Sequence, residues 1–309
     1  MAISNPIDGQ GIVDRFEDLV TDVANTGIVW GINNKPFTEM PNANYSLEST
    51  ILGQQNLTSG GSIAVTVPTG ANAIHIISAV GGGGGGMSGA AYDKGGGESA
   101  GAGGGSGAYI SDKVFSVTAG ETMTFTVGSA GNGFTDTGFS AYNGTAGSGS
   151  TTSASGSTSG TLFSLTGGTG ASASGGSTHG PLRSNTAGTG GTATISGTVR
   201  TSNTFVETDG TTININTLNG GPVGTFNQHG SGATGDNPGN CTTDNCLING
   251  GDGADSYNGT IAGGTGGVAG SSNGGVGTRG SGGGGGGSQT TSGADGGEGE
   301  IRYRFLAVS

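Results

Sequence analysis

The stretch that decides the fold is Ile74-His-Ile-Ile-Ser-Ala-Val80 followed at once by six glycines, Gly81 to Gly86. Its first half alternates in side-chain character with a period of two, which predicts a β-strand. Its second half carries no side chains, and glycine destabilises ordinary strands and helices. The sequence therefore predicts a strand that leaves its sheet at Val80 and enters a region built on glycine.

Glycine dominates the rest of the chain as well. The 309 residues include 74 Gly, and a second run of six spans Gly282 to Gly287. The runs are separated by segments that carry aromatic and branched apolar residues, unlike a uniform disordered linker. Collagen is excluded because Gly does not recur at every third position and Pro numbers only 7. A regular structure that uses such runs must exploit the missing Cβ.

One structure does so: a bundle of extended, left-handed helices with three residues per turn, the polyglycine II relative of polyproline II. Without Cβ atoms the backbones can approach closely, so that N–H and C=O groups pair between neighbouring helices. We favour this packed form over a largely disordered region, which is the alternative reading of the same composition.

Four further segments alternate like strands. Ile63 to Val67 precede a turn at Pro68-Thr69-Gly70, and Tyr109 to Val117 are joined through Ala119-Gly120 to Thr122 to Val127. Glu300 to Phe305 alternate strictly near the C-terminus. We predict a mainly β and irregular fold, a small antiparallel sheet or sandwich with strands at about 61–80, 108–127 and 299–308, and a glycine-rich, polyglycine II-like insertion at 128–297 that is anchored at both ends.

Residues 1–58 differ from this pattern. Apolar residues spaced four, three and four apart between Ile12 and Val23 predict a short amphipathic helix. A turn-rich apolar segment around Trp30 follows it. We interpret 1–58 as an N-terminal attachment module and 59–309 as a second domain; the alternative is that 1–58 simply pack on that domain. The attachment candidates are Ile12, Phe16, Leu19, Val23, Trp30 and Phe37.

The charge of the chain excludes several partners. A formal net charge of -12 with only nine Lys and Arg argues against nucleic acid and anionic membranes, which are held by clustered basic residues. No apolar stretch is long enough to span a bilayer, and the first residues lack the pattern of a secretory signal. We expect a protein that is made in a cytoplasm, with neither nucleic acid nor membrane insertion.

No motif indicates catalysis. Gly81-x-Gly83-x-x-Gly86 matches a dinucleotide fingerprint only because a glycine run satisfies it trivially, and no helix is predicted after it. The three His residues and the acids are dispersed, so neither a nucleophile with a positioned base nor a carboxylate pair is evident. We expect no enzymatic activity and no cofactor.

Metal and disulfide chemistry are also poorly signalled. Residues Gly250 to Asn258 fit one calcium-binding nonapeptide, but that site needs several stacked copies, so we expect no metal. Cys241 and Cys246 are close enough in sequence to bridge a small loop in an oxidising environment, or they remain reduced thiols.

Aromatic and basic residues isolated among Gly and Ser are the candidates for recognition. Such side chains dominate interfaces, and aromatics on Gly- and Ser-rich loops resemble antibody paratopes. The alternative for each is that it fills a gap between glycine helices or covers the sheet. The candidates are Tyr92, Lys94, Phe134, Phe139, Tyr142, Arg183, Phe205, Phe226, His229, Tyr257 and Arg279.

The order of these features resembles a known family. The succession from Ile63-Ala-Val-Thr-Val-Pro-Thr-Gly through Ile74 to Gly86, Gly107-Ala-Tyr-Ile and Val117 to Gly128, ending in Gly296-Gly-Glu-Gly-Glu-Ile-Arg-Tyr, resembles the glycine-rich domain of bacteriophage tail fibre proteins. It is also similar to the tip adhesins of T-even-type phages, in which packed polyglycine helices present loops to a host receptor. The glycine motifs are looser here and the insertion is longer.

The resemblance implies a function. Residues 1–58 would bind other tail fibre or tail proteins, and the segments between glycine runs would bind a bacterial surface protein or glycan. The expected location is the virion, which explains how a protein without a secretory signal works outside the cell. The alternative is a structural or assembly component that binds only other virion proteins. The sequence leaves open whether the chain caps a fibre as a monomer or forms a homotrimer.

Overall fold

Contacts within the chain define two units, Met1–Ala43 and Asn44–Ser309. The computed structural model describes part of the second unit, and the predicted helix between Ile12 and Val23 lies outside the described residues. Within them the structure is strand, turn or extended chain, and none is α-helical. The described residues are 46–47, 57, 60–89, 98–135, 144–174, 184–200, 204–206, 212–214, 229–230, 240–241, 248–257, 261–288 and 292–306.

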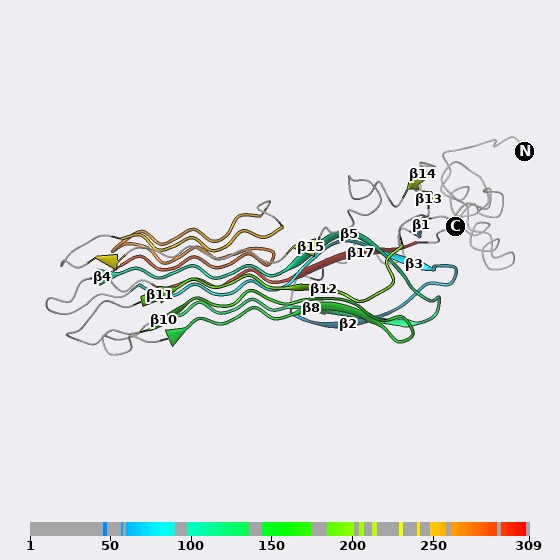
Figure 1. The fold of residues 1–309 in the computed structure, drawn as a ribbon, viewed down its shortest axis with the longest axis horizontal. Coiled ribbons are helices and arrows are strands. Elements are labelled where there is room, and N and C mark those ends of the chain that lie inside the picture. The colour runs from blue at the N-terminus through cyan, green and yellow to red at the C-terminus, as the bar shows by residue number, and fades with distance from the viewer. Residues whose placement is uncertain are drawn as a thin grey trace, which may run out of the picture. The chain divides into compact units, whose positions relative to one another are not determined.

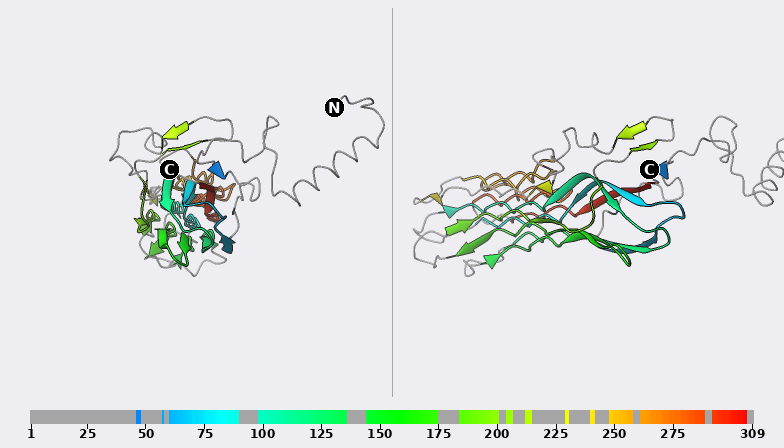
Figure 2. Two further views of the ribbon diagram at one scale, coloured as in Figure 1. Left: turned by 90° about the vertical axis from the view of Figure 1, so that its right-hand side faces the viewer. Right: turned by 45° about the vertical axis from the view of Figure 1, so that its right-hand side comes forward.

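Two five-stranded antiparallel sheets form a β-sandwich (Figures 1 and 2). The first sheet has the order β1 (Ser46–Leu47), β17 (Glu300–Leu306), β3 (Ala73–Val80), β5 (Tyr109–Ser116) and β15 (His229–Gly230). The second sheet has the order β12 (Ala193–Ile195), β9 (Gly160–Leu165), β8 (Thr152–Gly156), β6 (Thr122–Val127) and β2 (Gly61–Thr66). The predicted β class and antiparallel pairing are confirmed.

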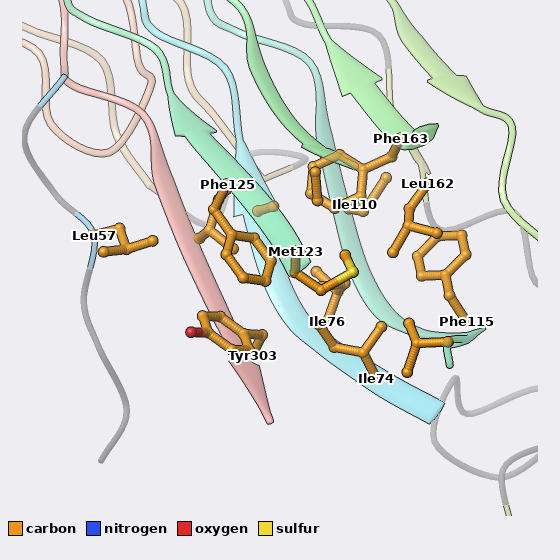
Figure 3. Packing of buried hydrophobic residues seen from close by; sticks show 14 of the residues in the cluster. Leu57, Ile74, Ile76, Ile110, Phe115, Met123, Phe125, Leu162, Phe163 and Tyr303 are labelled. Atoms are coloured by element: carbon orange, nitrogen blue, oxygen red, sulfur yellow. The ribbon is translucent and has the colours of Figure 1, made fainter. Parts of the chain in front are cut away.

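The hydrophobic core lies between the two sheets (Figure 3). Phe125 of β6 stacks on Tyr303 of β17 with ring centroids 4.2 Å apart, and Phe115 of β5 lies 6.3 Å from Phe163 of β9. The strict alternation predicted for the last strand is observed, because Ile301, Tyr303 and Phe305 are all buried in this cluster. A few large side chains thus join the sheets, as in other sandwiches.

The predicted turns connect the two sheets to each other. β2 pairs with β6 in one sheet, and β3 pairs with β5 in the other. The turn that ends at Gly70 and the turn that ends at Gly120 therefore both cross the core, and each glycine has a positive φ, +87° and +81°. The two connections are hydrogen-bonded to each other. Val67 donates its N–H to the Glu121 carbonyl at 2.8 Å, and Gly120 donates its N–H to the Val67 carbonyl at 2.9 Å.

The region from 128 to 297 returns to the sandwich before the last strand. Its segments β8, β9 and β12 complete the second sheet, where Leu162, Phe163 and Leu165 are buried. Elsewhere in this region and beside it the strands are short. They are β4 (Glu98–Ser99) with β16 (Asn240–Cys241), the sheet of β11 (Ser184–Thr186), β10 (Ser172–Ser174) and β7 (Gly144–Thr145), and the pair β13 (Thr204–Val206) and β14 (Thr212–Asn214).

Strands of the sandwich continue directly into glycine segments that lie side by side (Figures 1 and 2). After β3, the N–H groups of Gly81, Gly84 and Met87 donate in turn to carbonyls of one neighbouring segment, Ala108, Gly105 and Ala102, at 2.8–2.9 Å. A partner that recurs every third residue is the signature of the three-residue turn of a polyproline II-type helix. The glycine-rich region is thus a packed polyglycine II bundle rather than a linker.

The helix at Gly81–Met87 is an interior member of this bundle. Its N–H groups donate to three neighbouring segments, and its carbonyl groups accept from three others, so that six helices surround it. The acceptor segments contain Ala102 to Ala108, Gly147 to Ser150 and Ala294 to Gly297, and the donor segments contain Gly131 to Phe134, Gly168 to Ala171 and Gly283 to Gly286.

The second run of six glycines occupies an equivalent place. Gly283 and Gly286 donate to Gly84 and Met87 of the first helix, while Gly282, Gly284 and Gly285 donate to Ala254, Gly275 and Gly251. It also accepts hydrogen bonds from three segments, which include Gly264, Gly104 and Ala294. A helix surrounded on all sides has no room for a side chain at any position. Within the described part of the chain, each of the two uninterrupted glycine runs is therefore a helix with neighbours on every side.

Candidate functional site

The end of the bundle farthest from the sandwich, which we call the distal end, gathers chain segments that are remote in sequence. It carries β4, β10 and β11 (Figure 1), together with β7, which pairs with β10. There Cys241 of β16 lies opposite Glu98, and Ser172 of β10 lies opposite both Thr186 and Thr145. The residues that flank the undescribed segments 90–97, 136–143, 175–183 and 242–247 all belong to this end.

A small apolar cluster lies at the distal end of the polyglycine II bundle. Met87, Ala102, Ala171 and Ala173 are buried together, and the ring of Phe134 packs against them. The side chain of Asn185 is also buried and donates an N–H to the Ala100 carbonyl at 2.8 Å. These contacts hold the ends of several helices together, so the segments that leave them begin and end at fixed positions.

Five of the predicted recognition residues lie within the described part of the chain. Phe134 belongs to the cluster at the distal end, where its ring also fills the space beside Gly144. Tyr257 and Arg279 lie at the opposite end, where the bundle meets the sandwich. For two others only the backbone is described: Phe205 pairs with Ile213, and His229 pairs with Ile110.

The remaining candidates lie outside the described residues. They are Tyr92, Lys94, Phe139, Tyr142, Arg183 and Phe226, together with Cys246 and the attachment candidates Ile12, Phe16, Leu19, Val23, Trp30 and Phe37. Tyr92 and Lys94 fall in 90–97, Phe139 and Tyr142 in 136–143, and Arg183 in 175–183. Each of these three segments is flanked by described residues of the distal end.

The junction of bundle and sandwich is held by a buried carboxylate. Glu300 is 2% exposed, and its oxygens form ion pairs with Nε of Arg279 at 3.3 Å and Nε of Arg302 at 3.2 Å. Beside it, the ring of Tyr257 lies 5.7 Å from that of Tyr109. Burial, and then the charge of Glu300, raise the pKa of the Tyr257 hydroxyl above its usual value. Arg279 and Tyr257 thus have structural partners within the chain.

Side chains complete the hydrogen bonding where an outer helix lacks a backbone partner. Asn249, Asp252 and Asp255 recur every third residue, and each accepts an N–H of the adjacent antiparallel helix, from Ala269, Gly266 and Gly263. Asp252 and Asp255 of this ladder lie in the segment that fits the calcium nonapeptide, Gly250 to Asn258. Because these oxygens already bind backbone N–H groups, the match to that motif has a structural explanation.

Hydroxyl groups play the same role on another side. Thr166 and Thr169 accept the N–H groups of Thr192 and Thr189 at 2.6 and 2.7 Å. The sequence signal for these ladders is a polar residue at every third position between glycines, which composition alone does not reveal. Within the described ranges, no group of three or more His, Cys, Asp or Glu could hold a metal ion, and no helix is long and apolar enough to cross a membrane.

Comparison with known proteins gives one family. Residues 58–306 match the glycine-rich domain family, a span that covers most of the chain. The chain belongs to this glycine-rich domain family. No curated protein matches it. The matched span runs from beside Leu57, which bridges to Ile301 in the first sheet, to the last residue of β17, so the family domain includes both the sandwich and the bundle.

Proposed function

We propose that the protein is a bacteriophage tail fibre adhesin that binds a receptor on the bacterial surface through the segments at the distal end of its bundle. The observation that carries the proposal is the convergence of separate chain segments at that end, on helices fixed by backbone hydrogen bonds. Binding sites in proteins commonly lie on loops that a rigid scaffold positions.

The residue types in these segments support recognition. Tyr92 with Lys94, Phe139 with Tyr142, and Arg183 supply aromatic and basic groups, which contribute most to binding energy at interfaces. Gly and Ser around them supply adaptable hydrogen bonding, as in antibody paratopes. A scaffold that is ordered before binding reduces the entropy lost on association.

The geometry supports some candidates less than others. Phe134, Tyr257 and Arg279 have packing or ion-pair partners inside the domain, which is the structural alternative for each of them. Our proposed contact set therefore consists of Tyr92, Lys94, Phe139, Tyr142 and Arg183. In this proposal the N-terminal module attaches the adhesin to the tail, the location is the virion, and no chemical step takes place.

A binding assay with whole cells tests the proposal. The labelled full-length protein should bind the bacterium in which the phage grows, and binding is followed by flow cytometry as a function of concentration. Replacement of Phe139 and Tyr142 by Ser should raise the apparent Kd at least about tenfold, since an aromatic anchor contributes about 1–2 kcal/mol or more. Cells treated with protease or with periodate distinguish a protein receptor from a glycan.

The matched control is Val276→Ser, which alters a 66% exposed side chain on a described outer helix away from the distal end. We expect this variant to bind as the wild type does. Absence of binding to the host, combined with binding to purified tail proteins, would contradict the adhesin and favour the structural component. Equal loss in the control would show that the effect is not specific to the distal end.

A further inference from the structure

The second sheet of the sandwich ends in a strand that differs from the other sheet edges. The edge strands β1 and β15 have two residues each and β12 has three, whereas the edge strand β2 has six. Natural proteins protect long edges with charges, proline, bulges or covering segments, because an exposed edge pairs with other chains. Among the described residues, β2 is hydrogen-bonded to a strand on one side only, β6.

The composition of β2 offers none of the usual protection. Its residues, Gly-Ser-Ile-Ala-Val-Thr, include no charge and no proline, and its register with β6 is continuous. Five of the six residues are exposed. Ile63, in the middle, is 42% exposed and is one of three large apolar side chains exposed in the described part of the chain.

The absence of charge extends over the whole sheet. None of the five strands of the second sheet contains Asp, Glu, Lys or Arg, although the chain has a net charge of -12. Two copies with such a charge repel each other at most orientations. An approach along β2 places no like charges opposite one another within the joined sheets.

The hydrogen-bonding direction of β2 fixes how a second strand would fit. Val67, just beyond the strand, directs its N–H and C=O toward the β6 side, to Glu121 and Gly120. Because these directions alternate along an antiparallel strand, Ser62, Ala64 and Thr66 direct their backbone groups away from β6. Three such residues, centred on Ala64, match an identical strand that runs antiparallel about a two-fold axis.

We propose that β2 is the interface of a homodimer in which two copies of this chain pair their β2 strands, with Ala64 on the two-fold axis. Ser62 then lies opposite the partner's Thr66, and Ile63 lies opposite the partner's Val65. The contact is isologous, so it closes after two copies. It joins the two uncharged sheets edge to edge and covers Ile63.

The test is the molar mass of the full-length protein in solution. Light scattering during gel filtration, over a wide range of protein concentration, should show a mass that rises from 29.4 kDa to twice that value. Ala64→Lys places two positive charges directly opposite each other across the axis, about 5.5 Å apart at Cα. It should weaken dimerisation at least about tenfold.

The matched control is Thr124→Lys. Thr124 is the β6 neighbour of Ala64 and is also exposed on the outer face. In the dimer, Thr124 and the partner's Thr124 are separated by three strand spacings, about 14 Å, which exceeds the screening length of ~8 Å at physiological salt. This variant should dimerise within about threefold of the wild type. Circular dichroism confirms that both variants are folded.

Hydrogen exchange gives an independent readout. The amides of Ser62, Ala64 and Thr66 should exchange slowly in concentrated wild-type protein and faster on dilution or in Ala64→Lys. A single-chain mass at every concentration overturns the proposal. If the same amides are protected at all concentrations in that case, a segment of the same chain covers β2. An equal effect of both lysine substitutions also overturns it.

Discussion

Substitution of one interior glycine tests whether the bundle depends on the missing Cβ. Gly84 lies in the middle of the interior helix Gly81–Met87, where its N–H donates to the Gly105 carbonyl at 2.8 Å and its carbonyl accepts from Gly283 at 2.9 Å. A Cβ at this position would overlap the carbonyl group of Thr169 and would lie 2.8 Å from the nitrogen of Gly170. All of these atoms are backbone, so no side chain can rotate away.

The cost of Gly84→Ala follows from this geometry. To reach ordinary contact with the Thr169 oxygen the neighbouring helix must move by about 1.4 Å, which would stretch hydrogen bonds of 2.8–3.0 Å beyond useful length. Overpacking costs about 1–3 kcal/mol, and each lost hydrogen bond about 0.5–1.5 kcal/mol. The lower entropy of unfolded Ala offsets about 0.4–1 kcal/mol. A net loss of about 3 kcal/mol corresponds to a fall in Tm of about 6–12 °C.

The measurement is the thermal unfolding midpoint, followed by calorimetry, with Gly60→Ala as the matched control. Gly60 is exposed, and the nearest atom to its added Cβ is the Cβ of Ser129 at 3.1 Å, so a shift of only a few tenths of an ångström restores ordinary contact. We expect the control to change Tm by less than about 2 °C. Equal midpoints for Gly84→Ala and the control would refute the close-packed bundle.

Two further predictions concern pH. Burial would raise the pKa of the Glu121 carboxyl, but hydrogen bonds from Thr118, Ser159 and Thr158 outweigh burial and hold this pKa below its usual value of 4.5. Glu121→Gln should therefore lower the free energy of unfolding by about 1–2 kcal/mol above pH 5. The difference between wild type and variant should vanish as the pH falls through the folded-state pKa. Thermal unfolding at pH 7 and pH 3 checks this, and a pH-independent difference would contradict it. Burial lowers the pKa of Lys113 to about 8, against the opposing effect of Asp112. Between about pH 8 and 10.5 the unfolded chain therefore binds a proton that the folded protein does not bind. Over this range the wild type should gain stability relative to Lys113→Met as the pH rises, by at most about 1.4 kcal/mol per pH unit. Urea unfolding of both proteins at pH 7.5 and 9.5 measures that gain. The same change in the free energy of unfolding for both proteins would count against it.

Much of the strand framework could be predicted from the sequence, because alternation is a local property. The five strands near 61–80, 108–127 and 299–308 are present as β2, β3, β5, β6 and β17. That β8, β9 and β12 belong to the second sheet was not predicted. Their outward positions carry Ser, Thr and Gly, as the bundle segments do, and few large apolar side chains mark the inward face: Leu162, Phe163, Leu165 and the partly buried Ile195. Local composition does not distinguish such a strand from a polyglycine segment.

The candidate site was predicted less completely than the fold. A lone aromatic residue among glycines has the same local signal whether it faces a receptor or fills a gap, and the structure places Phe134 and Tyr257 against neighbours within the domain. Asp252 and Asp255 show the reverse case, since residues that fit a metal motif accept backbone N–H groups. Such roles depend on which helix lies alongside.

The sequence by itself determined where side chains are forbidden. Two uninterrupted runs of six glycines specify two helices with neighbours on every side, because only a residue without Cβ allows backbones to approach so closely. The tertiary structure alone decided which segments surround them, which sheet each strand joins, and which connections meet at the distal end. Those choices depend on hydrogen bonds between residues as far apart as Gly83 and Gly297, and nothing in the local sequence of either residue records its partner.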